Sequence, residues 1–247
     1  MTHVSIELVP RSPASLAADL HVLRDRLPSV RMVNIPDLLG FELRSWEACR
    51  QARDMLPRAI PHLRAMDFDL DRRLPALVET LRACDLREVL VVQGDAPQDL
   101  HHPVFPTKSA ELIRALKTAW PGATVYAAVD PYRSSFRTEM EHVAAKLDAG
   151  ADGFFTQPFF DLRLMDVWAE VLSGRDVYWG VSPVLSARTR RYWQTKNNAF
   201  FPASFEATLE WNRRFAADCL AWVRQRGAHI YYMPIRTDIA AYLDGIV

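Results

Sequence analysis

The sequence predicts a single α/β domain over residues 1–247, an eight-unit (β/α)8 TIM barrel. Short and almost continuously apolar runs alternate with amphipathic helical patterns, as in a parallel sheet that is buried on both faces. Most runs start about 24 to 36 residues after the previous one, the length of one βα unit, and the last gap is about 52 residues. The eight expected strands are Val4–Val9, Val30–Ile35, Ala59–Leu63, Glu88–Val92, Thr124–Val129, Gly153–Gln157, Val177–Val181 and His229–Met233.

Helical patterns fill the intervals between these strands. Apolar residues recur three or four positions apart, which places them on one face of a helix. Phe205–Arg226 predicts a long helix whose C-cap is Gly227. The shorter patterns are those of Leu16, Leu20, Leu23 and Leu27, of Leu74, Leu77 and Leu81, and of Leu112, Ile113 and Leu116.

Charge and hydropathy exclude several classes of partner. Thirty Lys and Arg balance thirty Asp and Glu, so net charge gives no reason to expect a nucleic-acid or membrane-surface partner. No apolar run approaches the roughly 18–20 residues of a membrane span, and the N-terminus lacks the features of a signal peptide. Homo-oligomerisation stays open.

The cysteines and histidines predict no metal site. Cys49, Cys84 and Cys219 are widely spaced, which favours free thiols in a reducing compartment and hence a cytoplasmic protein. His101 and His102 fall in a polar loop without a second set of ligands at metal spacing, so we expect them to face solvent.

The glycine content limits how a nucleotide could be bound. Only nine glycines occur, against sixteen prolines, and neither G-x-G-x-x-G nor G-x-x-x-x-G-K-[ST] is present. Both motifs need glycine where the backbone approaches phosphate. A Rossmann domain, the main alternative to the barrel, and a P-loop are therefore disfavoured.

Polar residues close nearly every expected strand. Barrel enzymes place their active sites at the C-terminal ends of the strands, so these residues are candidates for a site. Carboxylates and amides predominate, which suits a ligand with many donors and acceptors, such as a pterin. The candidates are Glu7, Asn34, His62, Gln93, Asp95, Asp130 and Gln157.

Glu7 is the most distinctive of them because it interrupts a strand that should be buried. One interpretation is a general acid whose pKa is raised by desolvation. The other is a strand-end carboxylate paired with an arginine. We favour the general acid.

The other candidates have structural explanations as well. Asp95 follows a glycine and could form a turn, or could accept hydrogen bonds from a ligand. Gln157 needs partners if buried, which a ligand or the backbone could supply. His62 could be a base, a ligand contact or a core histidine. The basic run at residues 188–191 is typical of a solvated helix start, and could also attract an anionic tail or a phosphate.

Six segments in order resemble one family. They are SIELVP near the N-terminus, Pro61–Leu63, Gln93–Pro97, Gly180–Val184, YYMPIRTDIAAYL near the C-terminus and, most specifically, KLDAGADGFFTQPFFD at Lys146–Asp161. Together they resemble the barrel domain of methylenetetrahydrofolate reductase.

The resemblance implies an enzyme of one-carbon metabolism and methionine biosynthesis that reduces 5,10-methylenetetrahydrofolate to 5-methyltetrahydrofolate. It implies that Glu7 is the proton donor to N10, and that Asp95 and Gln157 contact the pterin. Phe159, in the most specific segment, joins the expected substrate site.

Several positions that contact flavin in the family carry other residues in this sequence. Gln93 stands for the arginine before Gly-Asp, Asn34 for a threonine, Ala144 for a lysine, and residues 131–134 lack the usual Glu and His. The chain thus resembles a flavin-independent branch, in which NADH or NADPH passes hydride directly to the folate. We expect Asn34, His62, Gln93 and Asp130 on the cofactor side, and no S-adenosylmethionine domain.

Three alternatives stay open. One is a conventional FAD-dependent reductase with a remodelled pocket, and another is a reductase of a different C1-carrying pterin. The third is a non-catalytic folate-binding paralogue, which the retention of Glu7 disfavours. The choice between NADH and NADPH is not determined by the sequence.

Overall fold

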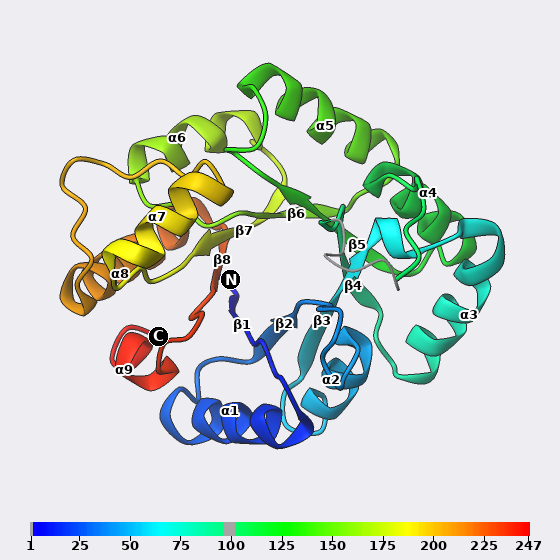
Figure 1. Ribbon diagram of the computed structural model, residues 1–247, viewed down its shortest axis with the longest axis horizontal. Coiled ribbons are helices and arrows are strands. Elements are labelled where there is room, and N and C mark those ends of the chain that lie inside the picture. Colours follow the sequence, from blue (N-terminus) through cyan, green and yellow to red (C-terminus); the bar gives the residue numbers. More distant parts are fainter. Residues whose placement is uncertain (1, 96–101) are drawn as a thin grey trace.

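A computed structural model, which describes residues 2–95 and 102–247, shows a closed barrel of eight parallel strands in sequential order (Figure 1). The predicted fold is confirmed, and each strand lies within one or two residues of its expected bounds. The strands are β1 Val4–Glu7, β2 Met32–Ile35, β3 Arg58–Arg64, β4 Glu88–Val92, β5 Thr124–Val129, β6 Gly153–Thr156, β7 Asp176–Val181 and β8 His229–Tyr232.

Pairing of the first and last strands closes the barrel. Val4 pairs with Ile230 and Ile6 with Tyr232, while on the other side of β1 Glu7 pairs with Asn34 of β2. β1 therefore lies between β2, the next strand in the sequence, and β8, the last one.

Helices surround the sheet, as Figure 1 shows. Two of them, α7 and α8, lie between β7 and β8, which explains the long last gap in the strand spacing. The helices are α1 Pro13–Arg26, α2 Ser45–Ala52, η1 Ala65–Asp67, α3 Leu70–Ala83, α4 Ser109–Ala119, α5 Phe136–Asp148, α6 Leu162–Val171, α7 Ala187–Lys196, α8 Leu209–Arg226 and α9 Ile239–Leu243.

The helix α8 starts later than the sequence pattern predicts. Thr208 is its N-cap and accepts a hydrogen bond from the backbone N–H of Trp211, so the helix begins at Leu209 and not at Phe205. Phe205 packs instead against the ring of Phe201 in the preceding loop. The predicted C-cap is confirmed, because Gly227 adopts the left-handed conformation with φ of 64°.

The N-terminal end of the barrel interior is filled by polar and aromatic side chains. Arg58 donates to both carboxylate oxygens of Glu88 at 2.9 and 2.6 Å, and to the hydroxyl of Tyr178 at 3.1 Å. The ring of Phe155 stacks on Tyr178 and also contacts Tyr231. Arg58, Glu88 and Tyr178 fill the N-terminal end of the barrel, and barrel enzymes place their sites at the opposite end.

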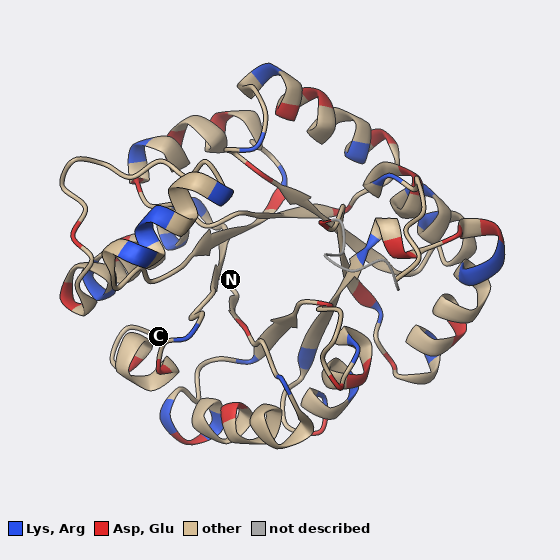
Figure 2. Cartoon of the chain, in the orientation of Figure 1, with Lys and Arg blue, Asp and Glu red and all other residues tan. Residues whose placement is uncertain are grey.

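Charged residues lie mainly on the helices and loops, while the strands are largely uncharged (Figure 2). Cys49 and Cys219 are buried, all three cysteines are free thiols, and burial raises the thiol pKa of both buried residues. In residues 2–95 and 102–247, no group of three or more His, Cys, Asp and Glu is arranged to hold a metal ion. None of the described helices is both long and apolar enough to span a membrane.

Candidate active site

Glu7 ends β1 at the C-terminal end of the barrel, and its side chain is only 7% exposed. Burial removes solvent from the carboxylate and raises its pKa to about 8, an effect that a hydrogen bond from Asn34 partly offsets. The carboxyl group therefore holds its proton at neutral pH, where an ordinary glutamate has lost it. This is the property that a general acid requires.

Two side chains from the neighbouring strands approach the Glu7 carboxyl group. The amide Nδ2 of Asn34, on β2, lies 3.0 Å from Oε2 of Glu7 and 3.1 Å from Nε2 of His62 on β3. Asn34 in turn accepts a hydrogen bond of 2.7 Å from the hydroxyl of Ser5. We call these four residues, Ser5, Glu7, Asn34 and His62, the Glu7 cluster.

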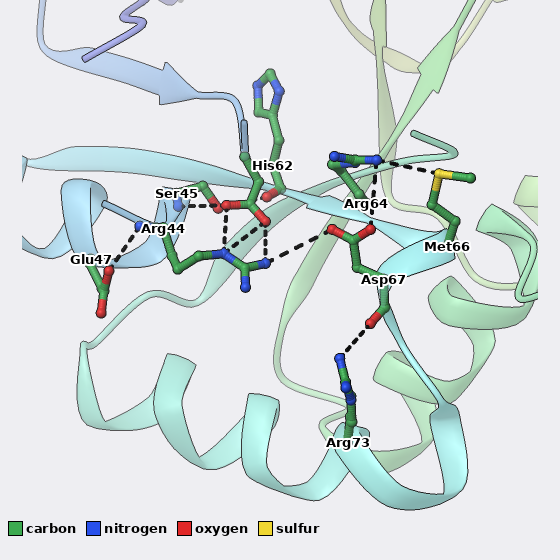
Figure 3. A network of polar contacts seen from close by, with 9 residues as sticks. Arg44, Ser45, Glu47, His62, Arg64, Met66, Asp67 and Arg73 are labelled. Atoms are coloured by element: carbon green, nitrogen blue, oxygen red, sulfur yellow. Dashed lines mark hydrogen bonds and ion pairs between the residues drawn. The ribbon is translucent and has the colours of Figure 1, made fainter. Parts of the chain in front are cut away.

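His62 is neutral in this environment. Its side chain is 9% exposed, and burial lowers the pKa of the imidazole to about 3. Figure 3 shows that its ring points away from the neighbouring network of charged side chains, while its backbone carbonyl accepts from Ser45 Oγ at 2.7 Å. His62 is thus a buried and neutral imidazole, and its expected contact with a cofactor stays a prediction.

Gln157 follows β6 at the same end of the barrel. Its backbone N–H donates to the carbonyl of Val129 at 2.7 Å, which fixes the position of the residue. Within the described part of the chain, no hydrogen bond reaches its half-buried side-chain amide. Substrate contact by this amide stays a prediction.

Tyr231 on β8 also faces the Glu7 cluster. Its hydroxyl donates to the backbone carbonyl of Thr156 at 2.6 Å, and its pKa is raised well above the ordinary value by burial and then by the charge of Glu7. The sequence reasoning missed Tyr231 and Ser5. A polar residue two positions before Glu7 on the same strand face was a signal for Ser5.

Asp95 is not buried with the Glu7 cluster. Its side chain is 86% exposed and pairs with Arg133, whose Nη2 lies 3.2 Å from Oδ1, while Arg133 Nε lies 3.3 Å from Asp130. The residue follows Gly94, which has a positive φ of 85°. Pterin contact by Asp95 stays a prediction, and residues 96 and 97 of the same motif, like His101, lie outside the described residues.

Three of the residues predicted to bind a cofactor form hydrogen bonds or ion pairs with other residues of the protein. The Gln93 side chain donates to the carbonyl of Thr107 at 3.1 Å and accepts from the N–H of Ser109 at 2.9 Å, at the start of α4. Asp130 accepts from the N–H of Tyr132, in addition to its ion pair with Arg133. Asn34 is fully used in the Glu7 cluster. Their predicted cofactor contacts stay predictions.

Phe159 lies apart from this cluster. Its ring has no exposed surface and packs against Trp179 and Tyr132, and Trp179 contacts Trp222 of α8. The ring therefore belongs to the layer between the barrel and its helices. Its expected contact with substrate also stays a prediction.

Figure 3 shows a charged network beside the cluster that the sequence reasoning did not identify. Arg44 Nε donates to Asp37 at 3.0 Å, and Arg64 Nη2 lies 3.7 Å from Asp67. Arg64 is two residues after His62 on β3, and its Nη2 also donates to the carbonyl of Asp95 at 2.6 Å. The network ties the ends of β3 and β4 together.

The family profile of methylenetetrahydrofolate reductase matches residues 43–230, about three quarters of the chain. The chain belongs to the methylenetetrahydrofolate reductase family. It is 26% identical over 151 residues to the 5,10-methylenetetrahydrofolate reductase of Pectobacterium carotovorum subsp. carotovorum, an alignment that covers 58% of this chain and 50% of that protein. It is 23% identical over 211 residues to the enzyme of Escherichia coli strain K12, covering 81% and 71%.

Among solved structures, an uncharacterized protein from Clostridium thermocellum shares the fold. Its TM-score is 0.66 at 11% sequence identity, and the match covers 98% of this chain and 93% of that one. That protein binds two copies of 5-methyl-5,6,7,8-tetrahydrofolic acid. At this identity the likeness demonstrates the barrel alone.

Proposed function

We propose that the protein reduces 5,10-methylenetetrahydrofolate to 5-methyltetrahydrofolate, with NADH or NADPH as direct hydride donor. The observation that carries this proposal is Glu7, a buried carboxyl group with a pKa of about 8 at the C-terminal end of the barrel. Family membership supports the substrate class, as does the folate bound by the Clostridium thermocellum protein.

The chemistry needs one proton and one hydride. Glu7 gives its proton to N10 of the folate, the bond from N10 to the bridging carbon breaks, and an iminium forms at N5. The carbon of this iminium accepts hydride from the reduced nicotinamide, which yields the N5-methyl group and NAD(P)+. Glu7, now a carboxylate, regains a proton from water.

In the proposed reaction, the C-terminal end of the barrel holds the folate and the nicotinamide in position. Direct transfer requires the two reacting carbons to approach to roughly 3–3.5 Å. The side-chain amide of Gln157 supplies donors and an acceptor for the pterin. Water is largely excluded at Glu7, which keeps the acid protonated until the substrate arrives.

A resident flavin fits these residues poorly. The side-chain amides of Asn34 and Gln93 are already hydrogen-bonded to other residues of the protein. They stand where the family pattern has other residues on the flavin side. The proposed reaction therefore has no flavin step.

An anaerobic assay tests the proposal. Purified protein is mixed with 5,10-methylenetetrahydrofolate and each reduced nicotinamide nucleotide, with and without added FAD, and its absorbance spectrum is recorded. We expect nucleotide oxidation that depends on the folate, is unaffected by FAD, and comes from protein without a flavin band. A flavin band together with FAD-dependent turnover would support the conventional reductase instead.

A second candidate is a folate-binding protein without turnover, because the Clostridium thermocellum protein binds 5-methyltetrahydrofolate, the product of the proposed reaction. Calorimetry with 5-methyltetrahydrofolate separates the two. Binding without any folate-dependent nucleotide oxidation would favour this candidate.

A further inference from the structure

Asn34 makes hydrogen bonds with all its polar side-chain atoms inside the barrel. Its Oδ1 accepts from Ser5 Oγ at 2.7 Å, while Nδ2 lies 3.0 Å from Glu7 Oε2 and 3.1 Å from His62 Nε2. Ser5 and Asn34 have no exposed surface. Solvent therefore does not compete for these contacts, and the amide is held in one orientation.

This orientation fixes which atoms donate. An amide nitrogen can only donate, so Oε2 of Glu7 and Nε2 of His62 are both acceptors. A neutral imidazole that accepts at Nε2 carries its hydrogen on Nδ1. Burial keeps His62 neutral, which agrees with this assignment.

The same orientation distinguishes the two oxygens of Glu7. Oε2 already accepts from Asn34, which is the role of the carbonyl oxygen in a protonated carboxyl group. Among residues 2–95 and 102–247, no hydrogen bond reaches Oε1. We propose that Ser5 and Asn34 are positioning residues that confine the acidic proton of Glu7 to Oε1, the oxygen left free to donate to a substrate. The identity of the proton's acceptor rests on the proposed function, whereas the network itself does not.

The surroundings of Glu7 make Asn34 the main polar influence on its acidity. The titratable groups that face it are His62 from β3 and Tyr231 from β8, and both are neutral at physiological pH. No arginine or lysine of the described chain forms an ion pair with Glu7. Asn34 is thus the neighbour whose hydrogen bond favours the ionised form of Glu7, and its loss should raise the pKa further.

The test uses Asn34→Leu, which keeps the approximate volume and removes the hydrogen bonds, and Ser5→Ala as a milder change. The full-length protein is labelled with 13C at its glutamate carboxyl groups and titrated by NMR, with Glu7→Gln identifying the signal. We expect the pKa of Glu7 to rise in Asn34→Leu and, by less, in Ser5→Ala. In the folate assay, the alkaline limb of the kcat/KM profile should move the same way, and kcat should fall about tenfold to a hundredfold.

Asn212→Leu is the matched control. Asn212 is a buried asparagine on α8 whose side chain binds the backbone of Val184 and makes no contact with Glu7. Its substitution should lower stability and leave the pKa of Glu7 unchanged.

The proposal is overturned if the pKa of Glu7 is unchanged or lower in both Asn34→Leu and Ser5→Ala, or if Asn212→Leu produces the same rise. If the NMR pKa rises while the kcat/KM profile stays in place, the network is correct and the proton-donor role in the proposed function is wrong. The two claims can therefore fail separately.

Discussion

Burial shifts the pKa of Glu7 and the pKa of His62 in opposite directions, and both shifts leave the side chain neutral. The carboxyl group holds its proton and the imidazole lacks one, because a low-dielectric site disfavours the charged form of each. Of this pair, only Glu7 can therefore donate a proton near neutral pH. This asymmetry leads to two predictions at the scale of single residues.

The first concerns turnover. Glu7→Gln keeps the shape and the polar contact to Asn34 but has no acidic proton. We expect folate-dependent NAD(P)H oxidation to fall by about 10²- to 10⁴-fold while folate binding is retained, as measured by steady-state kinetics and calorimetry. Turnover close to that of the wild type would remove Glu7 from the mechanism.

The second concerns pH. The acid must be protonated to act, so kcat/KM should decline as pH rises through about 8. The free energy of unfolding depends on the same carboxyl group. Between pH 4.5, the ordinary pKa of a glutamate, and pH about 8, the unfolded chain loses this proton while the folded chain keeps it, so the folded state loses stability as pH rises.

Glu7→Gln should therefore gain stability relative to wild type as pH is raised across that window. One pKa unit corresponds to about 1.4 kcal/mol. Urea denaturation at pH 5 and at pH 9 measures the difference, and a constant gap between the two proteins would contradict the buried acid.

At the scale of the strands, Gly180 determines how β6, β7 and β8 meet behind the site. A Cβ at this position would lie 2.8 Å from the carbonyl oxygen of Thr156 and 2.8 Å from the Tyr231 ring. The backbone N–H of Gly180 also donates to Thr156 Oγ1 at 3.0 Å. The absence of a side chain at residue 180 is what lets Tyr231 pack beside β7.

We expect Gly180→Ala to destabilise the protein by about 1–3 kcal/mol, since neither the backbone oxygen nor the buried ring can move freely. Gly122→Ala is the control, because its nearest neighbour outside the adjacent residues is the Trp120 side chain at 3.9 Å. Thermal unfolding followed by circular dichroism compares them, and equal midpoints would show that the contact at residue 180 can relax.

At the scale of the molecule, the alternation of buried strands and amphipathic helices is strong enough for the sequence to predict the barrel. Each unit repeats the same pattern, so errors at one boundary do not affect the others. The late start of α8 does not follow from apolar spacing, because the side-chain cap at Thr208 decides the boundary.

The site was predictable only in part. Glu7 is recognisable because a carboxylate inside an apolar strand is unusual. The partners of Asn34 depend on the register between β1, β2 and β3, which no local pattern encodes. The family resemblance predicts Asn34 on the cofactor side, and that contact stays a prediction, whereas its hydrogen bonds with Ser5, Glu7 and His62 are seen only in the structure.

We expect the barrel to unfold as a unit, because β8 pairs with β1 and one core is shared by all eight strands, so neither half keeps its strands paired when the other unfolds. Five of the seven tryptophans lie at or after residue 168, so fluorescence reports mainly on the C-terminal half, whereas far-ultraviolet circular dichroism reports on all helices. We expect the two urea transitions to coincide. Separate midpoints would indicate two independently folding halves.

The most direct test of the central claim is anaerobic oxidation of NADH and NADPH by flavin-free protein in the presence of 5,10-methylenetetrahydrofolate, followed across pH in the wild type and in Glu7→Gln. We predict 5-methyltetrahydrofolate as the product, a decline in kcat/KM above pH about 8, and loss of turnover in the variant. No folate-dependent oxidation at any pH, or turnover only after FAD is added, would contradict direct hydride transfer with Glu7 as the acid.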